Sequence, residues 1–72
     1  MSDLSVLIVD DEQPARKKLH AFLSKEDHVA DIREAANGVE AVQAIESSKP
    51  DLVLLDIQMP GMNGFEVIEA VG

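Results

Sequence analysis

The chain has 72 residues, of which 46% are hydrophobic, six are basic and fourteen are acidic, so its formal net charge is −8. This length allows one small domain at most, because domains commonly have about 100–150 residues. The apolar content argues against an intrinsically disordered chain. A charge of this sign repels phosphate backbones and anionic membrane surfaces, and two phenylalanines are the only aromatic residues. Direct binding to nucleic acid or to a membrane is therefore not expected, whereas binding to a cation is.

Other function classes are excluded by what the sequence lacks. The chain has no cysteine, so disulfide frameworks, thiolate metal sites and cysteine nucleophiles are excluded. The N-terminal residues lack the basic flank of a signal peptide, and no apolar run approaches the ~18 residues of a membrane-spanning helix. We expect a cytoplasmic protein.

The first two predicted elements are a buried strand and an amphipathic helix. The run at 6–9 is apolar, mostly β-branched and followed by Asp10 and Asp11, which favours a buried strand. Pro14 suits the first turn of a helix. One face of that helix is apolar, and its members are Ala15, Leu19, Phe22 and Leu23. The basic residues Arg16, Lys17 and Lys18 are expected to form a solvated outer face.

The remaining segments continue the alternation of strands and helices. Residues 28–35 alternate weakly and carry charges, as expected of an edge strand. Helical spacing follows Asn37, and the apolar run at 52–55 predicts a strand covered on both faces. A third helix is predicted after Asn63, with Phe65, Ile68 and Val71 on one side. Asn37 and Asn63 each precede a glutamate by three residues, so both are expected to cap helices.

The order βαβαβα predicts an α/β fold with parallel strands and right-handed crossovers. Strands 6–9 and 52–55 require cover on two faces, and the charged strand suits an edge. A spatial order of 2-1-3 satisfies these requirements. It is the first half of a flavodoxin-like doubly wound parallel sheet, whose switch point lies between strands 1 and 3.

This topology predicts a cluster of carboxylates. Asp10 and Asp11 follow strand 1, and Asp56 follows strand 3. Because adjacent parallel strands end at the same edge of a sheet, the three side chains are expected to converge at the switch point. Their mutual repulsion then requires either a bound divalent cation or protonation of one carboxyl group. Oxygen ligands alone favour a hard ion, and Mg²⁺ is the first choice.

A carboxylate beside Mg²⁺ can also act as a nucleophile and form an aspartyl phosphate. Asp56 is the best candidate, because it ends the most apolar strand and precedes a loop that contains Pro60 and Gly61.

Two segments carry a resemblance to a known family. Residues 7–12, Leu-Ile-Val-Asp-Asp-Glu, and residues 50–64, which include Leu-Leu-Asp-Ile-Gln-Met-Pro-Gly-Met-Asn-Gly, resemble the receiver domain of two-component response regulators. The resemblance covers essentially the whole chain. It implies that Asp56 accepts a phosphoryl group from a histidine of a sensor histidine kinase. It further implies that Asp11 and Asp56 ligate Mg²⁺ through their side chains, that Asp10 does so mostly through water, and that Gln58 offers its backbone carbonyl.

The resemblance also bears on the output and the extent of the domain. Residues 10–19 are similar to receivers attached to LytTR-type DNA-binding domains, so a transcriptional output through another domain is expected. A complete receiver has five strands, so residues 1–72 are expected to be a partial receiver domain with strands 1–3 and helices 1–3. Strands 4 and 5, with the hydroxyl and lysine that bind the phosphoryl oxygens, have no counterpart here. The outer edge of strand 3 then predicts self-association, most simply as a homodimer.

Two other readings remain. A haloacid-dehalogenase-type hydrolase forms an aspartyl phosphate too, but it requires a second acid where this chain has Gln58. A pseudo-receiver that serves only assembly would not need Asp10, Asp11 and Asp56. The favoured hypothesis is a phosphoacceptor signalling domain and not an enzyme with turnover.

Overall fold

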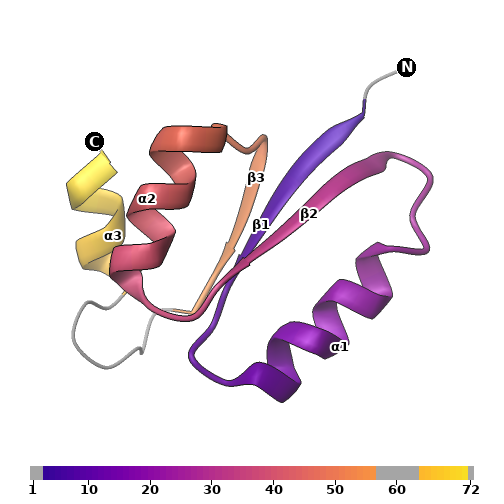
Figure 1. The fold of residues 1–72 in the computed structure, drawn as a ribbon, viewed down its shortest axis with the longest axis horizontal. Coiled ribbons are helices and arrows are strands. Elements are labelled where there is room, and N and C mark those ends of the chain that lie inside the picture. The colour runs from indigo at the N-terminus through magenta and orange to yellow at the C-terminus, as the bar shows by residue number, and fades with distance from the viewer. Residues whose placement is uncertain (1–2, 57–63, 72) are drawn as a thin grey trace.

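The computed structural model describes residues 3–56 and 64–71, which form three parallel strands and three helices. The strand order is β2-β1-β3, as the sequence predicts. In Figure 1, α1 covers one face of the sheet, while α2 and α3 lie together on the other. The elements are β1 (Leu4–Val9), α1 (Gln13–Leu23), β2 (Val29–Ala35), α2 (Gly38–Ser48), β3 (Leu52–Leu55) and α3 (Gly64–Val71).

Strand β1 is the centre of the sheet. It pairs with β2 along one edge and with β3 along the other, and its last four residues, Val6 to Val9, are at most 1% exposed. An apolar run suits this position, because both faces of a central parallel strand are covered by helices. Each of these side chains contributes about 1.5–3 kcal/mol by burial.

The core beneath α2 and α3 joins the sheet to the two helices on that face. Leu7 and Val9 of β1 pack with Ala35 at the end of β2, Ala41 of α2 and Val67 of α3. The small side chain of Ala41 is fully buried, which allows α2 to approach the sheet closely. This packing places the first turn of α2 and the end of β1 at the same edge of the molecule.

Strand β2 is an edge strand, as its charges predict. Arg33 Nε lies 3.0 Å from Asp31 Oδ2 on its exposed side, and such charges discourage pairing with another chain. The predicted alternation of its residues is wrong in part. The pairing register shifts between Leu4 and Ser5, so Ala30 is passed over, and Val29 and Ile32 are the more buried residues among 29–34. Such a bulge moves side chains from one face to the other.

The helix starts follow the sequence signals where the structure describes them. Pro14 lies in the first turn of α1. Asn37 caps α2: its Oδ1 accepts a hydrogen bond of 2.9 Å from the backbone N–H of Glu40. The carboxylate of Glu40 in turn accepts one of 2.9 Å from the N–H of Ala36. This reciprocal pair satisfies two backbone donors at the helix start. The predicted cap at Asn63 lies outside the described residues.

Three predicted helix faces need correction. Phe22 is 66% exposed rather than buried, and Ile68 of α3 is 56% exposed, whereas its neighbour Val67 is buried. Arg16 is not on a solvated face, since its side chain is only 14% exposed. Lys17 and Lys18 are exposed as expected. Helical spacing thus located the amphipathic segments but not the rotation of each helix on the sheet.

Strand β3 is less covered than predicted. Leu52 is 44% exposed and the next three residues are half-buried. Within the described residues β3 pairs with β1 alone, which leaves its other edge open. Within the same residues, no helix has the length and hydropathy that a membrane crossing needs.

Candidate phosphoacceptor and metal site

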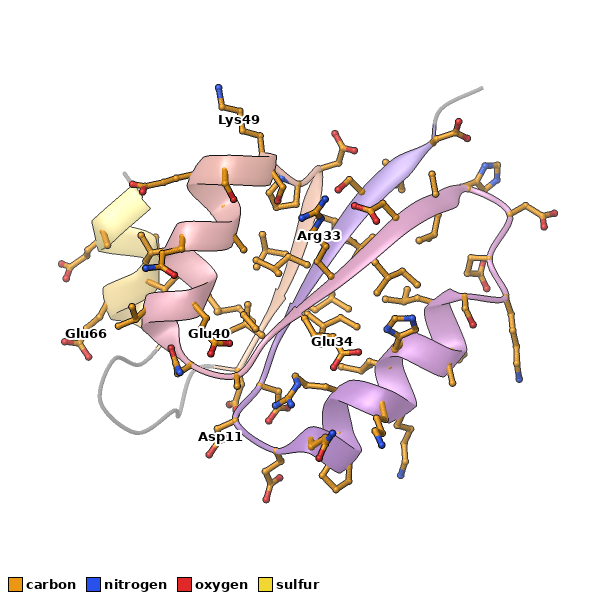
Figure 2. The ribbon with its side chains drawn as sticks, viewed as in Figure 1. Asp11, Arg33, Glu34, Glu40, Lys49 and Glu66 are labelled. Carbon is orange, nitrogen blue, oxygen red and sulfur yellow. The ribbon has the colours of Figure 1, made fainter. Side chains whose placement is uncertain are left out.

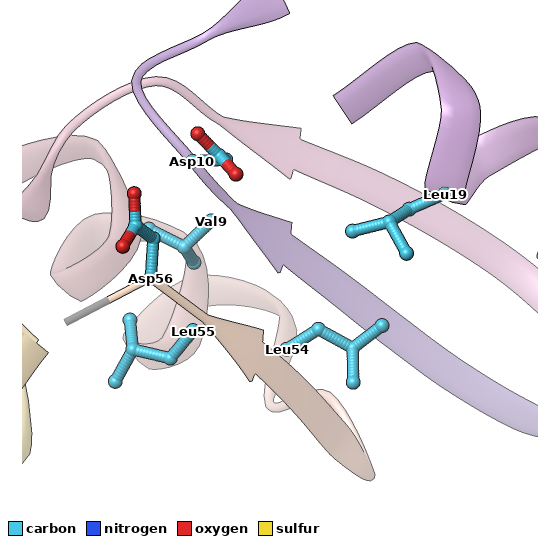
Figure 3. Close-up of a pocket in the computed structure, with 6 residues that line it drawn as sticks. All are labelled: Val9, Asp10, Leu19, Leu54, Leu55 and Asp56. Atoms are coloured by element: carbon cyan, nitrogen blue, oxygen red, sulfur yellow. The ribbon is translucent and has the colours of Figure 1, made fainter. Parts of the chain in front are cut away.

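The candidate site lies at the carboxyl edge of the sheet, where β1 and β3 end side by side. Val9 is the register partner of Leu55, and the backbone N–H of Asp56 donates a 2.9 Å hydrogen bond to the carbonyl oxygen of Val9. An aspartate follows each strand directly, so Asp10 and Asp56 lie next to each other at this edge. Figure 3 shows the carboxylates of Asp10 and Asp56 at this edge.

Asp10, Asp11 and Asp56 come together as predicted. One carboxylate oxygen of each lies within 4.8 Å of the others, and no second group of three or more His, Cys, Asp or Glu side chains meets this condition in residues 3–56 and 64–71. Asp10 and Asp56 are half-buried, and Asp11 is exposed in the turn that leads to α1 (Figure 2). We call these three side chains the carboxylate cluster.

The donor set fits a hard divalent cation. Three carboxylates supply oxygen ligands only, and Mg²⁺ binds by one or two carboxylates together with waters and phosphate oxygens. Unit charges 4.8 Å apart repel by about 0.9 kcal/mol in water and by about 3.5 kcal/mol at an effective dielectric constant of 20. A cation at the cluster removes this repulsion. The predicted backbone ligand, Gln58, lies outside the described residues.

Three groups of Asp10 form hydrogen bonds: its backbone N–H, its side-chain Oδ1 and its backbone carbonyl oxygen. Its backbone N–H donates to the carbonyl oxygen of Ala35 at 3.1 Å, and its Oδ1 accepts from the backbone N–H of Glu12 at 3.0 Å. Its own carbonyl oxygen accepts from Nη1 of Arg16 at 2.8 Å. The end of β1 is thus tied to β2, to the following turn and to the first turns of α1.

Arg16 belongs to a network that the sequence analysis missed. Its Nε donates to Oε1 of Glu34 at 3.1 Å, and the other oxygen of Glu34 lies 2.8 Å from Nδ1 of His20. We call Arg16, His20 and Glu34 the α1–β2 network. Arg16 and His20 are four residues apart and therefore share a helix face. This spacing is the one signal in the sequence from which a shared carboxylate partner could have been inferred. Figure 2 shows Glu34 on β2 beside α1.

An apolar pocket adjoins the cluster. It has a volume of about 410 Å³, and it opens between α1 and β3 (Figure 3). Its lining residues are Val9, Asp10, Leu19, Leu54, Leu55 and Asp56. Asp10 and Asp56 therefore border both the apolar residues of this pocket and the edge of the sheet where Asp11 lies.

Comparisons with known proteins agree with this architecture. The sequence model of the response regulator receiver domain matches residues 6–71. An uncharacterized response regulatory protein of Yersinia pestis is 50% identical over 64 residues, which are 89% of this chain and 27% of that protein. The transcriptional regulatory protein BtsR of Salmonella typhi is 45% identical over 65 residues, with 90% and 27% of the two chains covered.

Among solved structures, the receiver domain of the histidine kinase CKI1 from Arabidopsis thaliana, complexed with Mg²⁺, superposes with a TM-score of 0.83 at 27% identity. The match covers 94% of this chain and 55% of that one. The chain thus spans about a quarter of the length of the two curated relatives and about half of this solved receiver. The matched family, the identities and the parallel 2-1-3 sheet lead to one conclusion: the chain belongs to the response regulator receiver domain family.

Proposed function

We propose that the chain is the phosphoryl-accepting part of a two-component response regulator, and that Asp56 takes a phosphoryl group from a phosphohistidine of a sensor histidine kinase. The observation that carries this proposal is the carboxylate cluster, with its oxygens within 4.8 Å of one another at the switch point between β1 and β3. Receiver domains are signalling modules, and several relatives of this chain are transcriptional regulators.

The proposed reaction is a nucleophilic displacement at phosphorus. A carboxylate oxygen of Asp56 attacks the phosphorus atom, a P–O bond forms, and the P–N bond to the histidine breaks. The electron pair of that bond stays on the imidazole nitrogen, and the ring leaves as neutral imidazole because its other nitrogen carries a proton. The product is an aspartyl phosphate on this chain.

The chain's own residues hold the nucleophile and the cation. The hydrogen bond from Asp56 N–H to Val9 places the nucleophile beside Asp10, and the half-buried position of Asp56 limits competing water. Asp10, Asp11 and Asp56 are proposed to hold Mg²⁺, with the backbone carbonyl of Gln58 as a further ligand. Bound Mg²⁺ supplies neutralisation of the charge on the transferring phosphoryl oxygens.

The same proposal extends to the rest of the protein. Residues 1–72 are assigned to the part of a receiver domain that runs from its first strand to its third helix. The output is transcriptional and acts through another domain, of the LytTR type, in the cytoplasm. The net charge of −8 supports this division of roles, because direct contact of this segment with DNA would be repulsive.

The test is phosphorylation of the purified protein by a small phosphodonor such as phosphoramidate, followed by intact-mass analysis. We expect one added phosphoryl group, which requires Mg²⁺ and is lost in Asp56→Asn. The matched control is Asp51→Asn at the opposite end of β3, where the side chain accepts a hydrogen bond from Ser5 N–H that an amide oxygen also accepts. Phosphorylation of Asp56→Asn at the wild-type rate would refute the assignment.

A further inference from the structure

The α1–β2 network connects the carboxylate cluster to two elements that carry none of its members. Arg16 lies on α1 and Glu34 on β2, yet the guanidinium of Arg16 contacts the backbone of Asp10 itself. Its side chain is 14% exposed, compared with 57% for Arg33 in the ion pair on the outer side of β2. A shielded guanidinium with acceptors on two different elements is a stronger constraint than an exposed pair.

We propose that Arg16 is the positioning residue of the carboxylate cluster, and that Glu34 orients Arg16 for this role. The proposal rests on the proposed function, since it assigns a task toward the bound cation. Arg16 holds the carbonyl of Asp10 at the point where the chain leaves β1, and Asp11 follows directly. The direction of both carboxylates therefore depends on this contact.

The geometry calls for arginine in particular. Nε and Nη1 donate in fixed directions to Glu34 and to Asp10, at 3.1 and 2.8 Å. A lysine ammonium is a compact point charge on a flexible stem and does not present this rigid fork. Glu34 has a second effect: by accepting from Nε, it keeps the guanidinium on the backbone carbonyl and away from the carboxylates that the cation must occupy.

A purely electrostatic role for Arg16 predicts the opposite result from a positioning role. If Arg16 acted only through its positive charge, its removal would make the cluster more negative and Mg²⁺ would bind more tightly. If it acted only in folding, its removal would lower stability and leave the Mg²⁺ affinity of the folded protein unchanged. Loss of positioning weakens Mg²⁺ binding in a protein that still folds.

The experiment is calorimetric titration with MgCl₂ of the wild-type protein, Arg16→Gln, Arg16→Lys and the control Arg33→Gln. The control removes the same charge from an exposed ion pair on β2, the strand that carries Glu34. We expect both Arg16 variants to bind Mg²⁺ about tenfold more weakly, as is found for residues that orient metal ligands. Arg33→Gln is expected to match wild type. Far-UV circular dichroism establishes that each titrated variant is folded.

Three outcomes would overturn the proposal: tighter or unchanged binding in Arg16→Gln, full affinity in Arg16→Lys, or an equal loss in Arg33→Gln. If Arg16→Gln does not fold, Glu34→Gln replaces it, because its amide oxygen still accepts a hydrogen bond but no longer carries a charge. We expect a smaller loss of affinity in that variant, and wild-type affinity would count against the proposal. Failure of the wild-type protein to bind Mg²⁺ would refute the proposed metal site itself, which is a different result from wild-type binding that Arg16 does not affect.

Discussion

Replacement of Asp11 by asparagine separates two opposite energetic effects of the carboxylate cluster. Without a cation, the three carboxylates repel one another, so removal of one charge should stabilise the folded protein. With Mg²⁺ present, the same carboxylate is a ligand, so its removal should reduce the stabilisation that the cation provides. Asp11 is the most suitable member, because it is exposed and its replacement leaves the packed interior unchanged.

The expected magnitudes follow from the geometry. At separations up to 4.8 Å, each pair that includes Asp11 contributes about 0.9 kcal/mol of repulsion in water, the value suited to an exposed group. Asp11 also lies one residue before the N-cap Glu12, where attraction to the helix dipole of about 0.3–1 kcal/mol offsets part of that gain. The net stabilisation is about 1 kcal/mol, which raises the melting temperature of a domain this small by about 4–8 °C.

Bound Mg²⁺ has the opposite effect on the comparison, because it stabilises the wild-type protein more than Asp11→Asn. At a hundredfold excess over Kd, Mg²⁺ stabilises the wild type by about 2.7 kcal/mol. A tenfold loss of affinity in Asp11→Asn lowers this gain to about 1.4 kcal/mol at the same concentration.

The assay is thermal unfolding followed by circular dichroism at low ionic strength, with EDTA or with millimolar MgCl₂. Asp27→Asn is the control, since it removes an exposed carboxylate from the turn between α1 and β2 that is not in the cluster. A melting temperature for Asp11→Asn that falls in EDTA, together with an undiminished response to Mg²⁺, would show that the carboxylates neither repel one another nor share a cation.

Three further predictions concern the fold. Asn37→Ala should cost about 1 kcal/mol in urea unfolding, because the N–H of Glu40 loses its 2.9 Å partner, while Asn37→Asp should cost little. Leu7→Ala, at a fully buried position, should cost about 2–5 kcal/mol, whereas Phe22→Ala at a 66% exposed position should change stability by less than about 0.5 kcal/mol; equal urea midpoints would contradict the assigned core. The protein should self-associate through the open edge of β3, most simply as a homodimer, and sedimentation of a monodisperse monomer at micromolar concentration would contradict this.

The sheet and the carboxylate cluster were accessible from the sequence because their determinants are local. An apolar run predicts a strand that is covered on both faces, and a charged strand predicts an edge, so three segments read separately agree with the order 2-1-3. Asp10 and Asp56 each follow such a run directly. Once parallel pairing is inferred, their meeting at one edge requires no further information.

The details that the sequence did not reveal depend on contacts between distant segments. The bulge opposite Leu4 results from the match between two strands and has no marker such as glycine in either one. The burial of Val67 in place of Ile68 depends on how α3 rotates against α2. Helical spacing defines an apolar stripe, but the stripe's exact orientation is set by the surface on which it packs.

The position and the orientation of the clustered carboxylates depend on different parts of the fold. The strand ends bring the aspartates to one edge, but a carboxylate on a free turn samples many directions, and each must be restricted before a cation binds tightly. Arg16 and Glu34 supply this restriction from outside the strands that carry the cluster, through the carbonyl of Asp10. A chain could therefore retain the aspartates in sequence and still lose tight binding if either partner changed. The presence of the three acidic residues predicts where the site lies, and the network that orients Asp10 determines how well it works.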